Sequence, residues 1–373
     1  MKLNRNSYIS TKRDAWVEIN LGNLENNVLE IKKHLNKNVK LLAVIKADAY
    51  GHGAVMCAPI LLASGVDMFG VASIDEAQQL REAGITSEIL VLGAVPVWAV
   101  EYAARNNITI SIFSEEHIEA CRQTFEKTNL IPKVHIKLDT GMNRIGVQKQ
   151  SAIDFIKKVQ ELKYIDLKGV FTHFANAENR EKTQIQIDIF KDIISQINTE
   201  DLIVHCANSA AIMAYDDIQF DMVRAGIILY GLLPELPPNS TFLPRLKPLI
   251  GLKGRITNIH EINENDGVSY GHTFISNNKT KVATIPIGYA DGVSRNLSNK
   301  IFGFVNNKKI KQIGNITMDQ MMFDLGNNEA RVGDIVSLLN KEYTIDEWAS
   351  LLNTINYELT CRLKVRLSRV YVR

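Results

Sequence analysis

The stretch between residues 40 and 230 alternates short β-rich apolar runs with longer amphipathic segments, and few folds accommodate that alternation. Helices are predicted, for example, at Ile74–Ala83 and Gln184–Gln196. Strands that alternate with helices pair in parallel through right-handed connections. Eight such strands favour an α/β fold, a closed (β/α)8 TIM barrel over residues 15–245. The predicted strands are Leu41–Lys46, Phe69–Val71, Ile89–Leu92, Ile108–Ser111, Lys133–Leu138, Leu167–Thr172, Leu202–Cys206 and Met222–Arg224.

The segment from Pro234 to Pro248 interrupts this alternation, because it holds five of the nine prolines of the chain. It predicts a domain boundary. Beyond it, residues 246–373 predict a mostly β domain with a short helix at about Ile345–Leu352. Asn-Asn pairs at 277–278 and 306–307 predict tight hairpin turns. The strand-like runs of this domain are Leu252–Ile262, Lys281–Ile285, Phe302–Val305, Ile335–Leu339 and Lys364–Val372.

The composition of the 373-residue chain excludes several classes of protein. Forty-three Lys and Arg against 41 Asp and Glu leave a net charge of +2, which gives no sign of a nucleic-acid or membrane partner. The four cysteines form no C-x-x-C pair, and none lies near His at the spacing of a metal site. Scattered cysteines fit a reducing compartment, and the N-terminus carries no apolar signal segment. The sequence therefore predicts a cytoplasmic protein without a bound metal.

The first predicted strand ends in a lysine, Lys46, directly after the apolar run Leu-Leu-Ala-Val-Ile. Active sites of α/β barrels lie at the C-terminal ends of the strands. An amine whose stem lies against an apolar wall can have a lowered pKa and form a Schiff base with a carbonyl. Lys46 is therefore a candidate for covalent catalysis, although a solvated lysine at a strand end is the commoner case.

Two further strand ends carry groups that suit a phosphate. Gly226 follows the eighth strand and lets the backbone N–H groups approach an anion closely. Ser209 follows the seventh strand and offers a hydroxyl, unless it serves only as a helix cap. A phosphate site after strands seven and eight, together with a lysine after strand one, suggests pyridoxal 5'-phosphate, whose aldehyde reacts with a lysine.

Several segments of the chain, in this order, resemble the motifs of the bacterial alanine racemases, and the resemblance spans nearly the whole chain. It implies a barrel followed by a β domain, in a homodimer where the β domain of one subunit completes the active site of the other. It also implies the interconversion of L-alanine and D-alanine on a pyridoxal phosphate aldimine, which supplies D-alanine for peptidoglycan. The segments are Val44–Gly53, Lys137–Gly146, Thr172–Ala175, Ala207–Ala210, Arg224–Ile227, Val268–Gly271, Ile287–Gly292 and Met318–Gln320.

The resemblance implies roles for single residues around the cofactor. Lys46 binds the cofactor and acts as one catalytic base, and Tyr270, supplied across the dimer interface, acts as the opposite base. Two bases suit the reaction, because the proton leaves one face of a planar intermediate and returns on the other. Arg224 faces the pyridine nitrogen, with His173 behind it. The phosphate is held by Tyr50, Ser209 and the amides of Gly226 and Ile227.

The same resemblance implies the residues that bind the substrate. Arg144 and the backbone of Met318 place the substrate carboxylate, and Tyr289 lines the entrance. Lys137 matches a lysine that is carbamylated in many members, where the negative group positions Arg144. The sequence departs from the family at Val365, where members often carry a tyrosine that bonds the phosphate and crowds the substrate side chain.

Three alternative functions stay open at this point. The volume left by Val365 admits a larger side chain, so one alternative is a serine or broad-spectrum amino-acid racemase of the same fold. Another is an amino-acid decarboxylase with the same two domains, although the sequence shows no motif for its proton donor. The third is a non-catalytic pyridoxal-phosphate carrier. Such proteins resemble the barrel alone, and the chain beyond Pro248 argues against that class.

Overall fold

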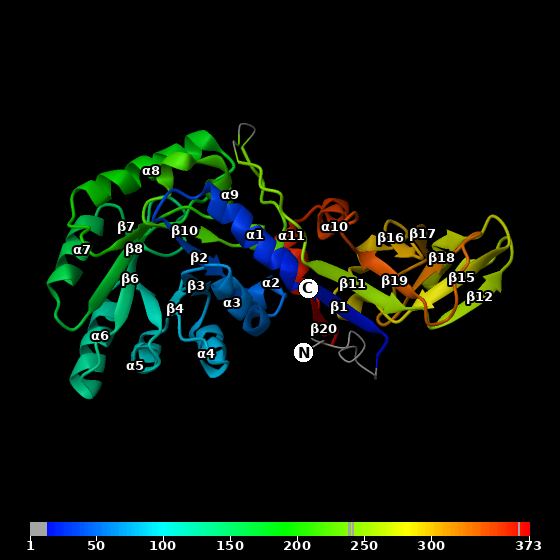
Figure 1. The fold of residues 1–373 in the computed structure, drawn as a ribbon, viewed down its shortest axis with the longest axis horizontal. Coiled ribbons are helices and arrows are strands. Elements are labelled where there is room, and N and C mark those ends of the chain that lie inside the picture. The colour runs from blue at the N-terminus through cyan, green and yellow to red at the C-terminus, as the bar shows by residue number, and fades with distance from the viewer. Residues whose placement is uncertain (1–12, 238–239, 241, 365) are drawn as a thin grey trace. The chain divides into compact units, whose positions relative to one another are not determined.

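The computed structural model describes residues 13–237, 240, 242–364 and 366–373 (Figure 1). They form two compact units. The barrel unit comprises residues 24–49 and 53–246, and the C-terminal unit comprises residues 13–23, 50–52 and 247–373, within the described positions. No helix in the described part of the chain has both the length and the apolar character needed to cross a membrane.

The barrel unit is built on a parallel sheet with the strand order β10-β2-β3-β4-β5-β6-β8-β9, which confirms the predicted fold class. Two backbone hydrogen bonds, from Asp221 N–H to the Val204 carbonyl (3.1 Å) and from Arg224 N–H to the Ala207 carbonyl (3.0 Å), bring the last strand back to β9. The strands are β2 (Lys40–Val44), β3 (Met68–Val71), β4 (Glu88–Val91), β5 (Thr109–Ile112), β6 (Lys133–Asp139), β8 (Asp166–Phe171), β9 (Ile203–His205) and β10 (Met222–Ala225), with a short β7 (Val147–Gln148) beside β6.

The helices of the barrel unit lie around the outside of these strands (Figure 1). The strands are almost continuously buried, as expected for a parallel sheet covered by helices. Both helices predicted by residue range are present, although the second begins four residues before its predicted start, at Arg180. The helices are α1 (Leu21–His34), α3 (Ala54–Ala63), α4 (Ile74–Glu82), α5 (Val100–Arg105), α6 (Glu115–Thr128), α7 (Ala152–Glu161), α8 (Arg180–Ser195) and α9 (Ser209–Ala214).

The C-terminal unit is mostly β, as predicted, and its main sheet has the order β12-β15-β18-β17-β16-β19-β11-β1-β20. Helix α10 (Ile345–Leu352) has the predicted bounds, and α11 (Asn356–Arg362) follows it. The strands are β1 (Ala15–Asn20), β11 (Ile250–Arg255), β12 (Asn258–Ile262), β15 (Thr280–Ile285), β16 (Phe302–Val305), β17 (Lys308–Ile313), β18 (Met321–Asp324), β19 (Ile335–Leu339) and β20 (Ser368–Val372), and β13 (Gly267–Val268) pairs separately with β14 (Phe274–Ile275).

The first strand differs from the sequence prediction, which began the barrel at residue 15. Strand β1 pairs antiparallel with β11 and parallel with β20, so it belongs to the sheet of the C-terminal unit. Its partners begin more than 200 residues further along the chain, and no local pattern indicates such a pairing. Helix α1 then begins at Leu21, directly after β1 ends, and leads the chain into the barrel unit.

The two predicted Asn-Asn turns have different outcomes. Asn306 and Asn307 adopt φ of 51° and 62° between the paired residues Val305 and Lys308, so this hairpin turn is confirmed. The turn predicted at 277–278 is wrong as a hairpin, because the flanking strands β14 and β15 pair with β13 and with β12 and β18 instead. The long run Leu252–Ile262 likewise divides into two strands, β11 and β12.

Candidate active site

Lys46 lies just beyond the first barrel strand and begins a left-handed turn. Strand β2 ends at Val44, two residues earlier than the sequence predicted, and Lys46–Tyr50 forms the short element α2. Its residues Ala47 to Tyr50 have φ between 50° and 54°, which is left-handed helical backbone without any glycine. Such backbone costs about 1–2 kcal/mol per residue in an L-amino acid. Strain of this kind persists where surrounding bonds enforce it, and it clusters at functional sites.

The carboxylate of Asp48 helps to hold this turn. Asp48 Oδ1 accepts a hydrogen bond from Ala54 N–H at 2.7 Å, and the Asp48 carbonyl accepts one from Gly53 N–H at 2.9 Å. The turn ends at Tyr50, which belongs to the C-terminal unit, where its ring lies 6.0 Å from the ring of Tyr357 in α11. The local bonds therefore tie the residues after Lys46 to the start of helix α3.

Arg224, in strand β10, is a buried cation whose partners are uncharged. Its Nη2 donates to the carbonyls of Thr172 (2.8 Å) and Cys206 (2.9 Å) and lies 3.2 Å from His173 Nδ1. Its Nη1 lies 2.9 Å from His205 Nδ1. Burial lowers the pKa of Arg224 to about 10, which still leaves the guanidinium protonated at neutral pH. No carboxylate is among these partners, so the site favours a further electron-rich group beside the guanidinium.

Two buried histidines, His205 and His135, extend the chain of hydrogen bonds that begins at Arg224. His205 Nε2 lies 2.9 Å from His135 Nδ1. Burial and the charge of Arg224 lower the pKa of both rings, that of His135 to about 3, so both are neutral. Because Arg224 donates to His205 Nδ1, His205 carries its proton on Nε2 and donates it to His135. Gly169 leaves room for this pair, since a Cβ there would lie 2.6 Å from His135 Cε1.

Ser209 is not the helix cap that the sequence left open. Asn208 caps α9, because its side chain accepts the N–H of Ala211 at 3.0 Å. The Ser209 hydroxyl oxygen instead accepts the N–H of Gly226 at 2.8 Å, and both residues are buried. Ile227 follows as the first residue of a short 3₁₀ turn, Ile227–Tyr230. The structure therefore brings together the residues after strands seven and eight that the sequence predicted to bind a phosphate.

Lys137, in strand β6, lies among the other cationic groups of the barrel unit. Its Nζ is 5.4 Å from the centre of the Phe171 ring. Burial, followed by the charges of Arg144, Arg224 and Lys46, lowers its pKa to about 8. The same charges act on His173, whose pKa falls well below its usual value, mainly through burial. The predicted residues Lys46, Lys137, Arg144, His173 and Arg224 therefore share one electropositive region, which suits an anionic ligand.

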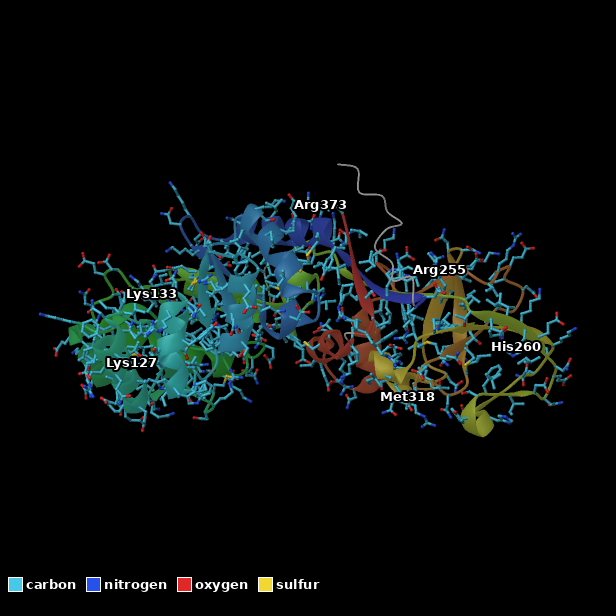
Figure 2. All side chains as sticks on the ribbon, turned by 90° about the horizontal axis from the view of Figure 1, so that it is seen from below. Lys127, Lys133, Arg255, His260, Met318 and Arg373 are labelled. Atoms are coloured by element: carbon cyan, nitrogen blue, oxygen red, sulfur yellow. The ribbon has the colours of Figure 1, made fainter. Side chains whose placement is uncertain are left out.

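The remaining predicted residues, Tyr270, Tyr289 and Met318, belong to the C-terminal unit and are exposed. The side chain of Tyr270 is 73 % exposed, while its carbonyl accepts a hydrogen bond from Asn315 Nδ2 at 2.6 Å. Met318, labelled in Figure 2, lies in a loop beside the Tyr289 turn. Two backbone bonds join them, from Tyr289 N–H to the Thr317 carbonyl (2.9 Å) and from Ala290 N–H to the Met318 carbonyl (3.0 Å).

A buried carboxylate that the sequence analysis missed holds this pair of loops. The side chain of Asp291 is fully buried and accepts hydrogen bonds from two nitrogens each of Arg13 and Arg366, at 2.6–3.2 Å, and from Gly288 N–H at 2.9 Å. Burial alone raises the pKa of Asp291, but these hydrogen bonds outweigh burial and hold the pKa below its usual value. Arg366 also donates to Asp319 at 2.8 Å, which extends the cluster to the Met318 loop.

Replacing Asp291 by asparagine should destabilise the protein by about 1.5–3 kcal/mol, because the charge-assisted hydrogen bonds from two partly exposed arginines are weakened. Urea unfolding of Asp291→Asn at neutral pH measures the change. The matched control is Asp319→Asn, whose side chain is 60 % exposed and, among the described residues, bonds only Arg366, with an expected loss below about 1 kcal/mol.

The pH dependence gives a second check on Asp291. Its pKa is lowered in the folded protein, so its contribution is present above the pKa of the unfolded chain and is lost as pH falls through the folded value. The difference between wild type and Asp291→Asn should therefore shrink in acid. Equal stability of the two aspartate variants at neutral pH would contradict the role of Asp291.

The sequence contains only weak signals for the roles of His135, His205 and Asp291. Each histidine lies in a predicted strand, and Asp291 lies in the Ile287–Gly292 motif. Their partners, however, come from distant segments: His135 and His205 are 70 residues apart, and Asp291 and Arg13 are 278 apart. Val365, the one departure singled out in the sequence, lies outside the described residues.

Comparison with known proteins agrees with this geometry. Residues 19–234 match the family model for the N-terminal domain of alanine racemase, and residues 249–371 match the model for its C-terminal domain. A curated alanine racemase of a Nostoc species is 41 % identical, covering 98 % of each chain, and one from Methanococcus maripaludis is 39 % identical, covering 96 % of this chain and 98 % of the relative.

Solved structures give the same result. An alanine racemase from Clostridium difficile is similar with a TM-score of 0.91 at 39 % identity, covering 96 % of each chain. One from Bacillus anthracis, with bound L-Ala-P, has a TM-score of 0.88 at 36 % identity, covering 97 % of this chain and 95 % of the other. Because both domain models match and the identity extends over nearly the full length, the chain belongs to the alanine racemase family.

Proposed function

We propose that the protein interconverts L-alanine and D-alanine with pyridoxal 5'-phosphate as its cofactor, in active sites shared between the two subunits of a homodimer. The observation that carries the proposal is Arg224, a fully buried guanidinium with uncharged partners in the same electropositive region as Lys46. Full-length similarity to alanine racemases supports the substrate. The serine alternative has no such support among the relatives named above.

The residues present fit that cofactor. A phosphate would accept from the Ser209 hydroxyl and the Ile227 N–H, and the Gly226 N–H, which donates to Ser209 Oγ at 2.8 Å here, would turn to the phosphate when it binds. Tyr50 would add its hydroxyl, Lys46 would supply the amine for the aldehyde carbon, and Arg224 would face the ring nitrogen. When bound, the cofactor supplies a conjugated ring that withdraws the electrons left on Cα when its proton departs.

Arg224 would limit how strongly a bound cofactor withdraws the electrons left on Cα. The guanidinium keeps its protons at neutral pH and offers only donors, so a ring nitrogen placed beside it would accept a hydrogen bond instead of carrying a proton. His205 accepts from Nη1, and the carbonyls of Thr172 and Cys206 accept from Nη2, so these bonds hold the guanidinium plane in place, with His173 Nδ1 3.2 Å from Nη2. Arg224 in this position would therefore limit electron withdrawal by a bound cofactor, which would favour return of the proton over side reactions such as transamination.

Lys46 and Tyr270 would act as the two bases. Lys46 Nζ removes or returns the proton on one face of Cα, and Tyr270 Oη does so on the other. The fixed backbone of Tyr270 and its exposed side chain support a role toward a second subunit. Arg144 and the Met318 backbone would hold the substrate carboxylate, and Tyr289 would line the entrance.

Lys137 would carry a carbamate next to Arg144. Carbamate forms when a neutral amine adds to carbon dioxide and gives up a proton. Because its pKa is lowered to about 8, Lys137 has a larger neutral fraction near neutral pH than an ordinary lysine, although most of it stays protonated. The product anion would lie among the cations that lower this pKa, and it would reduce their mutual repulsion. The product of the overall reaction, D-alanine, would then serve peptidoglycan synthesis.

Proton exchange at Cα in heavy water tests the proposed function. The wild-type protein should incorporate deuterium into alanine while both enantiomers appear, and it should do so far more slowly with serine. Tyr270→Phe should lose racemisation in both directions, yet keep exchange with the one enantiomer whose Cα proton faces Lys46. Cofactor absorbance without any exchange would support the carrier alternative instead, and equal residual exchange from both enantiomers in Tyr270→Phe would contradict the two-base assignment.

A further inference from the structure

Helix α4 begins with a sequence that normally caps a helix but forms a different set of bonds here. Ser73 is the N-cap, and its Oγ accepts the N–H of Glu76 at 3.3 Å. In the usual capping box, the glutamate at this position accepts the N–H of the cap residue itself. Glu76 instead accepts the N–H of Ala72 with Oε2 and the N–H of Ala47 with Oε1, both at 2.7 Å. Its carboxylate therefore bridges two separate segments of the barrel unit.

One of these segments is the left-handed turn after Lys46. Ala47 is the next residue after Lys46 and the first of the turn with positive φ. Its N–H lies beyond the end of β2, so the strand ladder offers it no acceptor. Glu76 supplies one, and because it is a carboxylate the bond is charge-assisted and stronger than a neutral one. The peptide that joins Lys46 to Ala47 is thus held directly by a side chain of α4.

The other segment is the end of the neighbouring strand. Ala72 directly follows β3, which pairs in parallel with β2 through Leu42, Ala43 and Val44. One carboxylate thus spans the ends of two adjacent barrel strands, at the edge where Lys46 leaves the sheet. Glu76 lies in the first turn of α4, where the helix dipole favours its negative charge.

We propose that Glu76 is a positioning residue for Lys46, which fixes the left-handed turn so that the amine reaches Cα from one face. The proposal rests on the proposed function, since it takes Lys46 as a catalytic base. Without the carboxylate, the Lys46–Ala47 peptide loses the side-chain acceptor of its N–H, and the amine shifts with this peptide although the bonds of Asp48 still hold the rest of the turn. Misplacement of a catalytic group by about 1 Å costs up to about a hundredfold in rate.

Hydrogen exchange gives a first test that does not depend on activity. In purified Glu76→Gln, the amide group can accept with one oxygen only, so at least one of the Ala47 and Ala72 amides should exchange faster than in wild type. Glu76→Ala should speed up exchange at both. Mass spectrometry of peptides that cover residues 46–50 and 72–76 measures the change. Asp75→Asn is the matched control, because Asp75 is an exposed acidic neighbour in the same helical turn, and its exchange should equal that of wild type.

The second test measures proton exchange at Cα by Lys46 alone, without a contribution from Tyr270. In Tyr270→Phe, the residual Cα exchange with one enantiomer reports Lys46 alone. Adding Glu76→Gln should lower that residual rate by about tenfold or more, with little change in the KM for alanine. Adding Asp75→Asn should leave it unchanged. Circular dichroism and thermal unfolding confirm that each variant is folded, and Glu76→Asp, which keeps the charge on a shorter side chain, takes the place of any variant that is not.

The outcomes separate this proposal from the proposed function. Unchanged amide exchange in Glu76→Gln and Glu76→Ala, or an unchanged residual rate in the Tyr270→Phe background, overturns the positioning role while wild-type racemisation stands. Loss that appears only as a higher KM also overturns it, because a misplaced base lowers kcat. A wild-type protein that does not racemise alanine overturns the proposed function itself, and amide exchange then still reports whether Glu76 holds the turn.

Discussion

Lys46→Ala should lose racemisation by about 10⁴-fold or more, because the change removes both the amine that anchors the cofactor and one of the two bases. The structure gives a reason to expect little compensation. Lys46 lies on a left-handed turn beyond β2, whereas Lys137, the nearby lysine of the same electropositive region, projects from strand β6. A second amine would have to reach the same point from a different strand. The visible absorbance of the bound cofactor should also change, and racemisation and absorbance are measured on the same preparation.

Lys40→Ala is the matched control for this prediction. Lys40 begins the same strand β2, at the end opposite to Lys46, and its side chain is exposed. Barrel residues at the N-terminal ends of the strands contribute to stability rather than to catalysis. Lys40→Ala should therefore keep its activity and its absorbance. If Lys46→Ala also kept both, another lysine would be the anchor and the proposed site would be wrong.

Mixing two inactive variants should restore activity if the site is shared between subunits. Lys46→Ala lacks the base of the barrel unit, and Tyr270→Phe lacks the base of the C-terminal unit. In a heterodimer with shared sites, one site holds both intact residues and the other holds neither. Each heterodimer should then have about half of the wild-type activity, and statistical exchange of subunits should bring the mixture to about one quarter.

Recovered activity supports a shared site only if it rises with the fraction of heterodimer formed by subunit exchange. Native mass spectrometry of differently tagged variants measures the fraction of heterodimer, and activity should rise in proportion to it. A double variant, Lys46→Ala/Tyr270→Phe, mixed with either single variant is the control and should recover nothing. No recovery in a verified heterodimer of the two single variants would contradict a shared site and would place both bases in one chain.

The sequence by itself determined the eight main strands of the barrel. All eight predicted strands are present, within two residues at each end, because their β-branched apolar runs are buried on both faces and stand out against the amphipathic helices between them. Helix α10 has its predicted bounds, since Thr344 and Glu347 form a capping box at its start. Such signals are local, and each lies within a few residues of the element that it defines.

Only the tertiary structure decided which distant segments meet. Strand β1 joins the sheet of the C-terminal unit, Asp291 binds Arg13, and His205 links Arg224 to His135. In each case the partners are far apart in the chain, so no local pattern reports them. The left-handed turn after Lys46 is the sharpest example. Of its residues Ala, Asp, Ala and Tyr, only Asp occurs in that backbone with any frequency, and bonds from Asp48 and from Glu76, 29 residues beyond Ala47, hold the turn in place.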